Sequence, residues 1–204
     1  MEMDWKTNMA ELGGSFMVSW LVLANMTDMG AEDAALGSAD LMAAVMLAAA
    51  MAAMAGAHIL PMFTWISAMT GDLQDTDAWI GSVMRLVFQV LGAGAALALM
   101  AGDAGVSAAE TAPEMWAFDM WGLLGMVAAG AVIGAVASRC DGWVTAFAVV
   151  ALAGSLGMGV GGAEAMAAEV MGGGAMVEAA STWVLDGAII GVGAKLGGML
   201  DDAL

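Results

Sequence analysis

The sequence predicts an all-α integral membrane protein with six membrane-spanning helices and two short re-entrant helices. Of its 204 residues, 62% are apolar and 12% are charged, and the mean hydropathy is +0.87. Soluble domains are about half apolar and about a quarter charged, so a soluble core could not hide this much apolar surface. Apolar runs of nearly bilayer length recur along the chain, and two polar, glycine-rich stretches interrupt them. A lipid bilayer is therefore the expected surroundings of the helices.

Six apolar runs are the predicted spans. They cover about residues 10–27, 39–56, 79–101, 118–138, 143–160 and 182–200. A span needs about 20 residues, and local thinning of the bilayer accommodates the shorter runs. Glycine and alanine are abundant in these runs, which lets helix backbones approach closely in lipid. The residues before the first run are acidic, so no cleavable signal peptide is expected.

Two stretches, residues 57–78 and 161–181, are too polar and too rich in glycine to span a bilayer. Each contains a short apolar piece with a helical pattern. Irregular backbone at membrane depth is tolerated only where it is buried in protein or lines a cavity. Both stretches are therefore predicted to enter the membrane and return on the same side.

A weak internal repeat relates the two halves of the chain. Residues 10–16 open the first span and residues 118–124 open the fourth, and in each an acid precedes a glycine by three positions. Three spans separate the copies, which is an odd number, so the halves of about 8–101 and 115–200 must be inverted relative to each other within a single domain. Inverted repeats with broken helices are a transport architecture.

The net charge of −17 arises from 21 acids against four bases, which are Lys6, Arg85, Arg139 and Lys195. Such a surface repels nucleic acid, so no nucleic-acid partner is expected. The acidity fits adaptation to a high-salt habitat or, alternatively, vestibules that attract cations. With a cytoplasmic N-terminus all four bases fall on the cytoplasmic side, as the positive-inside rule requires, and both termini are then cytoplasmic.

Enzymatic chemistry is not expected from this sequence. One histidine, His58, does not allow a Ser-His-Asp set to be argued, and one cysteine, Cys140, cannot form a thiolate metal cluster. No glycine-rich phosphate loop with its lysine occurs. The 22 methionines are spread through all the spans, which favours flexible apolar packing over soft-metal transport. No metal and no cofactor are predicted.

Residues 56–64, Gly-Ala-His-Ile-Leu-Pro-Met-Phe-Thr, resemble the Gly-Ala-His-Leu-Asn-Pro-Ala-Val-Thr stretch of aquaporins and aquaglyceroporins. Residues 88–93 resemble the Gln-x-x-Gly-Ala of that family's third span, and residues 10–16 are similar to its Ala-Glu-x-x-Gly-Thr-Phe opening. The matches occur in the family's order, and the predicted topology agrees over the whole chain. The resemblance implies a homotetramer in the lipid bilayer that conducts water or a small neutral solute.

The resemblance also implies roles for four polar residues that would brace the re-entrant loops. Glu11 and Asp119 would be buried acids, His58 would pack beneath the pore and bond backbone groups, and Gln89 belongs to the matched third-span motif.

Pro61 would occupy the first turn of a half-helix, which would run to about Met69 and end at Thr70 and Gly71. The positive ends of two such half-helices would face each other at mid-membrane and repel cations.

Departures from the family pattern concern the pore itself. Leu60 replaces the asparagine of Asn-Pro-Ala and cannot donate a hydrogen bond. The second copy, in residues 161–172, has neither that triplet nor the following arginine, whose position falls at Ala168 or Glu169. The expected pore and constriction residues are Leu60, Pro61, Met62, Ala163, Glu164, Met166, Ala168 and Glu169. Asp40, Gly154 and Gly162 are candidates for the selectivity filter, although a loop-end acid is the plainer interpretation of Asp40.

Two outcomes for the pore remain open from the sequence. Small residues such as Gly154, Gly162 and Ala163 would widen the filter, whereas Leu60 and Met62, together with Met166, would form an apolar collar that dewets and blocks water. The leading expectation is a passive channel for water or small neutral solutes.

A cation-permeable channel is one alternative, because the filter arginine is missing and Glu164 and Glu169 lie in the second loop. These two acids could equally lie at the loop surface or at a half-helix N-terminus. A non-conducting structural or accessory membrane subunit is the other alternative, suggested by the apolar Leu60 collar.

Overall fold

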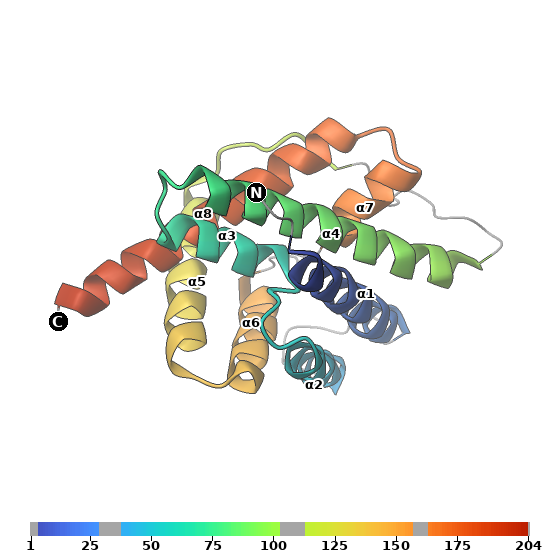
Figure 1. The fold of residues 1–204 in the computed structure, drawn as a ribbon, viewed down its shortest axis with the longest axis horizontal. Coiled ribbons are helices and arrows are strands. Elements are labelled where there is room, and N and C mark those ends of the chain that lie inside the picture. Colours follow the sequence, from blue (N-terminus) through green and yellow to red (C-terminus); the bar gives the residue numbers. More distant parts are fainter. Residues whose placement is uncertain (1–3, 29–37, 103–112, 157–162, 204) are drawn as a thin grey trace.

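A computed structural model describes residues 4–28, 38–102, 113–156 and 163–203, and over these residues the protein is all helical (Figure 1). The helices are α1 (Trp5–Asp28), α2 (Ser38–Ala53), α3 (Pro61–Thr70), α4 (Thr76–Ala101), α5 (Met120–Arg139), α6 (Gly142–Leu156), α7 (Glu164–Met171) and α8 (Met176–Ala203). No strand occurs in the described ranges, which confirms the all-α prediction for them.

Each predicted span coincides with one of the longer helices, and each re-entrant candidate contains one short helix, α3 or α7. Helix α3 begins at Pro61 and is followed by Gly71 as its C-cap, so both predicted boundaries are confirmed. Helix α8 begins at Met176, earlier than predicted, because residues 176–181 contain neither glycine nor proline and include good helix formers.

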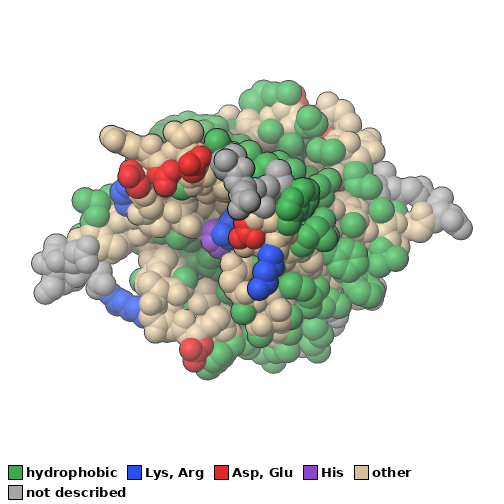
Figure 2. Space-filling model, in the orientation of Figure 1, with side chains coloured by type: hydrophobic (Ala, Val, Ile, Leu, Met, Phe, Trp, Pro, Cys, Tyr) green, Lys and Arg blue, Asp and Glu red, His purple; other side chains and the backbone are tan. Residues whose placement is uncertain are grey.

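Within the described residues, three helices are long and apolar enough to cross a membrane. They are α4, α5 and the Met176–Leu200 part of α8. Helices α2 and α6 contain apolar stretches that are shorter, Asp40–Ala53 and Gly142–Ala153. Large apolar side chains are exposed along outer helix faces, for example Leu91, Trp121 and Val132. Figure 2 shows such side chains gathered over the side of the molecule that carries α1, α4 and α7. These features are compatible with association with a membrane.

The helices pack in a regular set of pairs. Helix α1 packs on α4 and α5 packs on α8, while α2 packs on α6. The short helix α3 lies against α8 and α4, and the short helix α7 lies against α4 and α8. Helices α1 and α2 also touch, as do α5 and α6. Each short helix therefore contacts one longer helix from its own half of the chain and one from the other half.

Glycines permit the closest of these crossings. A methyl group added at Gly92 of α4 would collide with the backbone of α1 at Leu12. On the other side of the molecule, Gly130 of α5 lies against the Ile190 carbonyl, and Gly193 of α8 lies against the Val127 carbonyl. Small residues allow helix backbones to approach in this way, as the sequence predicted for glycine-rich spans.

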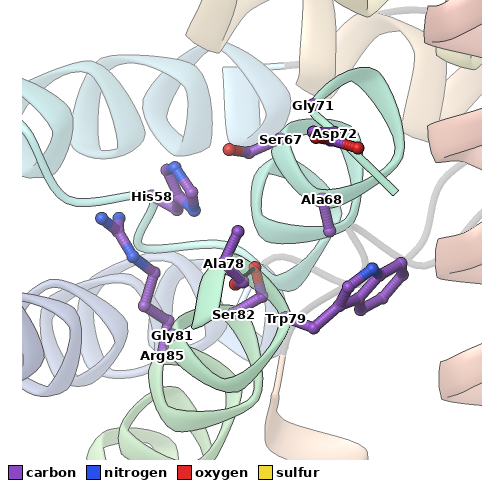
Figure 3. A pocket seen from close by; sticks show the side chains of 10 residues that line it. All are labelled: His58, Ser67, Ala68, Gly71, Asp72, Ala78, Trp79, Gly81, Ser82 and Arg85. Carbon is purple, nitrogen blue, oxygen red and sulfur yellow. Dashed lines mark hydrogen bonds between the residues drawn. The ribbon is translucent and has the colours of Figure 1, made fainter. Parts of the chain in front are cut away.

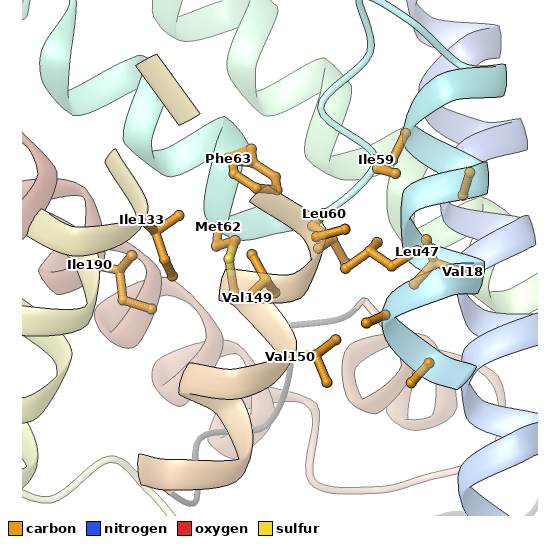
Figure 4. Close-up of a cluster of buried hydrophobic side chains, with 14 residues drawn as sticks. Val18, Leu47, Ile59, Leu60, Met62, Phe63, Ile133, Val149, Val150 and Ile190 are labelled. Atoms are coloured by element: carbon orange, nitrogen blue, oxygen red, sulfur yellow. The ribbon is translucent and has the colours of Figure 1, made fainter. Parts of the chain in front are cut away.

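The main apolar core lies between α2, α3 and α6 (Figure 4). Leu47 of α2 and Val149 of α6 lie in it with Leu60 and Met62 from the start of α3. Ile133 of α5 and Ile190 of α8 extend the cluster. A smaller cluster joins α4 to α7 through Ala93, Ala163 and Ala167.

Candidate functional site

The carboxylate of Glu11 on α1 is the centre of a buried polar network. Its exposed fraction is 0%, and it accepts hydrogen bonds from the backbone N–H of His58 (2.7 Å) and Ile59 (2.8 Å). It also accepts one from Nη1 of Arg85 (2.9 Å), which forms an ion pair, and one from Nε2 of Gln89 (2.7 Å). A buried carboxylate is tolerated only with such compensation. Glu11 therefore ties α1 and α4 to the connection between α2 and α3.

That connection contains a strained turn at Ile59. The φ angle of Ile59 is 56°, which is unfavourable for a β-branched residue. The N–H of Leu60 donates to the carbonyl of His58 (2.7 Å), so three residues form a γ-turn. The Ile59 side chain is buried beside Gly14 of α1, where an added methyl group would collide with it. The turn persists because Glu11 and this packing hold it.

A threonine joins the network to the start of α3. Thr64 Oγ1 lies 3.1 Å from Nδ1 of His58 and accepts a hydrogen bond from Nε2 of Gln89 (3.1 Å). Ser15 Oγ of α1 donates to the Gln89 carbonyl (2.7 Å), and Gln89 Oε1 is buried without a partner among the described residues. The first turn of α3 is thus fixed to both α1 and α4.

The structure brings together three of the four predicted bracing residues, namely Glu11, His58 and Gln89. Asp119 does not occupy an equivalent buried position. It is exposed directly before α5, and its carboxylate accepts a hydrogen bond from the Gly122 N–H (2.6 Å). Aspartate is favoured at such an N-cap, which accounts for its place there.

Two members of the network, Arg85 and Thr64, were not among the predicted site residues. Arg85 entered the sequence-based prediction only as one of the four bases that indicate orientation. Its spacing of four from Gln89 was a usable signal, because residues four apart share one face of a helix. That face of α4 meets Glu11.

The residues expected at the middle of a pore are packed in the apolar core. Leu60 is 1% exposed and Met62 is 3% exposed, in the same cluster as Leu47 and Val149 (Figure 4). Leu60 occupies the N-cap position of α3 with extended backbone, and its side chain makes no capping hydrogen bond. Pro61, also buried, begins the helix. Residue 60, where the family has asparagine, therefore lies in a closely packed apolar environment.

The candidates from the second loop lie in a different cluster. Ala163 is buried with Ala93 and Ala167, and Met166 and Ala168 are half-buried. Asp40 lies in the first turn of α2 and is partly exposed, where an acid suits the helix dipole. Gly162 lies outside the described residues, and Gly154 belongs to the end of α6, where side-chain surroundings are not described.

Both acids of the second loop have partners within the protein. Glu164 Oε1 accepts a hydrogen bond from Ser19 Oγ of α1 (2.8 Å). Glu169 is buried, and its Oε2 accepts one from the Ala175 N–H (3.0 Å), which closes the turn between α7 and α8. A methyl group added at Gly173 would collide with the Glu169 carboxylate, so the glycine makes room for this side chain.

A cavity of about 250 Å³ opens between α3 and α4, and we refer to it as the α3–α4 cavity. Its lining residues are His58, Ser67, Ala68, Gly71, Asp72, Ala78, Trp79, Gly81, Ser82 and Arg85. Figure 3 shows the imidazole of His58 beside the guanidinium of Arg85, with Ser67 and Asp72 on the α3 side. In Figure 2 the single histidine is visible at the bottom of a hollow. The cavity therefore reaches the Glu11 network from outside.

No protein-family model matches the chain, and no curated protein matches it.

Within the described residues, no group of three or more histidine, cysteine, aspartate or glutamate side chains could hold a metal ion.

Proposed function

We propose that the protein is a passive membrane channel of the aquaporin-like fold, for water or small neutral solutes. In this proposal α1, α2, α4, α5, α6 and α8 span the bilayer, and α3 and α7 are half-helices that enter it from opposite sides. The chain would assemble as a homotetramer, as the family resemblance implies, with both termini cytoplasmic.

The observation that carries the proposal is the equivalence of helix packing in the two halves. Exchanging α1–α4 with α5–α8 turns the α1 and α4 pair into the α5 and α8 pair, and the contact of α3 with α8 into that of α7 with α4. The α2 and α6 pair maps onto itself. A packing pattern that relates the two halves is what we expect of inverted repeats with broken helices, which are typical of membrane transport proteins.

The Glu11 network supports the re-entrant role of the segment before α3. Irregular backbone at membrane depth requires partners for its N–H groups, since lipid offers none. Glu11 provides acceptors for the His58 and Ile59 N–H groups, and Pro61 contributes no N–H at all.

A second candidate function, a non-conducting structural subunit of the same fold, is favoured by one observation. Leu60 and Met62 are packed against the α2 and α6 side chains with almost no exposure, so neither side chain lines an open passage. For the cation-channel alternative no such observation exists, because Glu164 and Glu169 both have hydrogen-bond partners in the protein.

Osmotic shrinkage of proteoliposomes separates the two candidates. We expect water, glycerol or urea permeability above that of empty vesicles, and a further rise in water permeability for Leu60→Asn, whose amide can bond passing water. Leu73→Asn is the matched control, because Leu73 is exposed in the connection between α3 and α4. Permeabilities of wild type and Leu60→Asn equal to those of empty vesicles, with both proteins folded, would exclude the channel and favour the structural subunit.

A further inference from the structure

One face of α1 carries three buried polar side chains, and each of them is bonded to a different part of the protein. Glu11, Ser15 and Ser19 are 0%, 2% and 0% exposed, and their spacing of four places them on one side of the helix. Glu11 binds the connection before α3, and Ser15 donates to the Gln89 carbonyl of α4 (2.7 Å). Ser19 donates to Glu164 Oε1 in the first turn of α7 (2.8 Å). The same face of α1 is therefore bonded to residues at, or directly before, the start of both short helices.

Local structure does not require the bond between Ser19 and Glu164. A serine inside a helix can donate to the carbonyl four residues earlier, so Ser19 has an alternative partner within α1. A glutamate in the first turn of a helix is favoured by the helix dipole without any bond to another helix. In the folded protein these two side chains instead meet across 145 residues of sequence. The tertiary structure therefore selects this contact.

Helix α7 lacks the support that the family resemblance assigned to Asp119. That side chain is exposed and caps α5, while the N-cap residue of α7, Ala163, makes no side-chain hydrogen bond. Ala163 and Ala167 pack on Ala93 of α4, and such small side chains bury little apolar area. Among the described residues, Glu164 is thus the side chain that fixes the start of α7 by a polar contact.

We propose that Ser19 and Glu164 anchor the N-terminal end of α7 to α1, and that they take the place of a brace from Asp119. In the first half of the chain the acid lies on α1 and the donors surround it. For α7 the acid lies on the short helix and the donor lies on α1. Glu164 is a positioning residue in this role, and one face of α1 sets the positions of both short helices. The anchor goes beyond the proposed channel function, because it holds α7 whether or not a solute passes.

Amide hydrogen exchange of the full chain in lipid nanodiscs, followed by mass spectrometry, tests the anchor. Ser19→Ala and Glu164→Ala should each raise the exchange rate of residues 164–171 by at least about tenfold, which is the loss expected for one hydrogen bond to a charged group. The exchange rate of α3 should stay at its wild-type value, because both variants leave the Glu11 network intact. Ser15→Ala is the matched control, since this buried serine of the same face donates to α4. It should leave α7 at the wild-type rate.

Two further variants separate the hydrogen bond from a general loss of stability. Glu164→Gln keeps an oxygen acceptor for Ser19, so the exchange rate of α7 should stay within about twofold of the wild type. The double variant Ser19→Ala with Glu164→Ala should exchange no faster than the faster single variant, because both changes remove the same bond. Wild-type exchange of α7 in both alanine variants, an equal rise in α3, or an equal effect of Ser15→Ala would overturn the proposal.

The anchor and the channel fail independently. Permeabilities equal to those of empty vesicles, together with the expected exchange pattern, would exclude the channel and support the anchor. Permeability above that of empty vesicles, together with wild-type exchange of α7 in both alanine variants, would overturn the anchor and support the channel.

Discussion

Burial of a carboxylate at Glu11 dictates the local structure around the start of α3. Four donors surround it, two of them backbone N–H groups of consecutive residues, His58 and Ile59. The other two donors are the side chains of Arg85 and Gln89, on one face of α4. The strained turn at Ile59 has no local reason to form, because a β-branched residue disfavours positive φ. The tertiary contact to Glu11 therefore imposes it.

Glu11→Gln should destabilise the protein strongly. The amide is neutral, so the Arg85 guanidinium loses its counter-charge, and the amide NH₂ faces groups that are themselves donors. Breaking a buried ion pair costs about 3 to 5 kcal/mol, which corresponds to a fall of roughly 10 °C in Tm. Thermal unfolding in detergent measures the change, with the exposed Glu114→Gln as control. Equal unfolding temperatures for the two variants would show that the network does not hold the fold.

At the scale of the elements, glycines determine how closely α5 and α8 pack. Gly193 lies against the Val127 carbonyl and Gly130 lies against that of Ile190, so backbone meets backbone. Gly198, further along α8, has no atom near the place that a methyl group would occupy. The two α8 glycines are thus a matched pair with different surroundings.

Gly193→Ala should lower stability by about 1 to 3 kcal/mol, because the methyl group forces the helices apart. Gly198→Ala should be neutral, or stabilising by up to about 1 kcal/mol from helix propensity alone. Denaturation of the two variants in the same detergent gives the comparison. A similar effect of both substitutions would contradict the close crossing of α5 and α8.

The beginning of α1 contains a pH-dependent cap. Asp4 accepts hydrogen bonds from the N–H (3.1 Å) and Oγ1 (2.6 Å) of Thr7. These bonds favour the carboxylate and hold the pKa of Asp4 below its usual value of 3.8. The stabilisation is therefore present above the unfolded pKa and disappears as the pH falls through the lower pKa of the folded state.

Amide hydrogen exchange at Thr7 should report this change. The protection factor, corrected for intrinsic exchange, should drop as the pH falls below 3.8 in the wild type. In Asp4→Asn the cap is kept by the amide oxygen, so protection should not vary over the same range. A pH-independent protection factor in the wild type would exclude the cap as the cause.

At the scale of the whole molecule, the helix positions could be predicted from the sequence because hydropathy determines them directly. The convergence of Glu11, His58 and Gln89 could be anticipated only from the family resemblance. The ion pair between Arg85 and Glu11 was not predicted. The positions of the four bases indicate the orientation of the chain in the membrane, but they do not identify the acid with which each base pairs. Burial of Leu60 and Met62 was not predictable, since it depends on how side chains of α2 and α6 pack against them. Asp119 caps α5 instead of bracing a loop as the family resemblance implied, because its carboxylate accepts the hydrogen bond of the Gly122 N–H.

The proposed inverted arrangement of the two halves requires the connections after α3 and after α7 to lie on opposite sides of the membrane. Leu73 and Gly174 lie in these connections, and both are exposed. Leu73→Cys and Gly174→Cys can be introduced singly after the exposed Cys140 is replaced by serine.

Labelling with a membrane-impermeant maleimide in intact cells tests this arrangement. If the two halves are inverted, Gly174→Cys reacts from outside and Leu73→Cys reacts only after permeabilisation. Reaction of both cysteines from the same side, in folded protein, would contradict the inverted architecture.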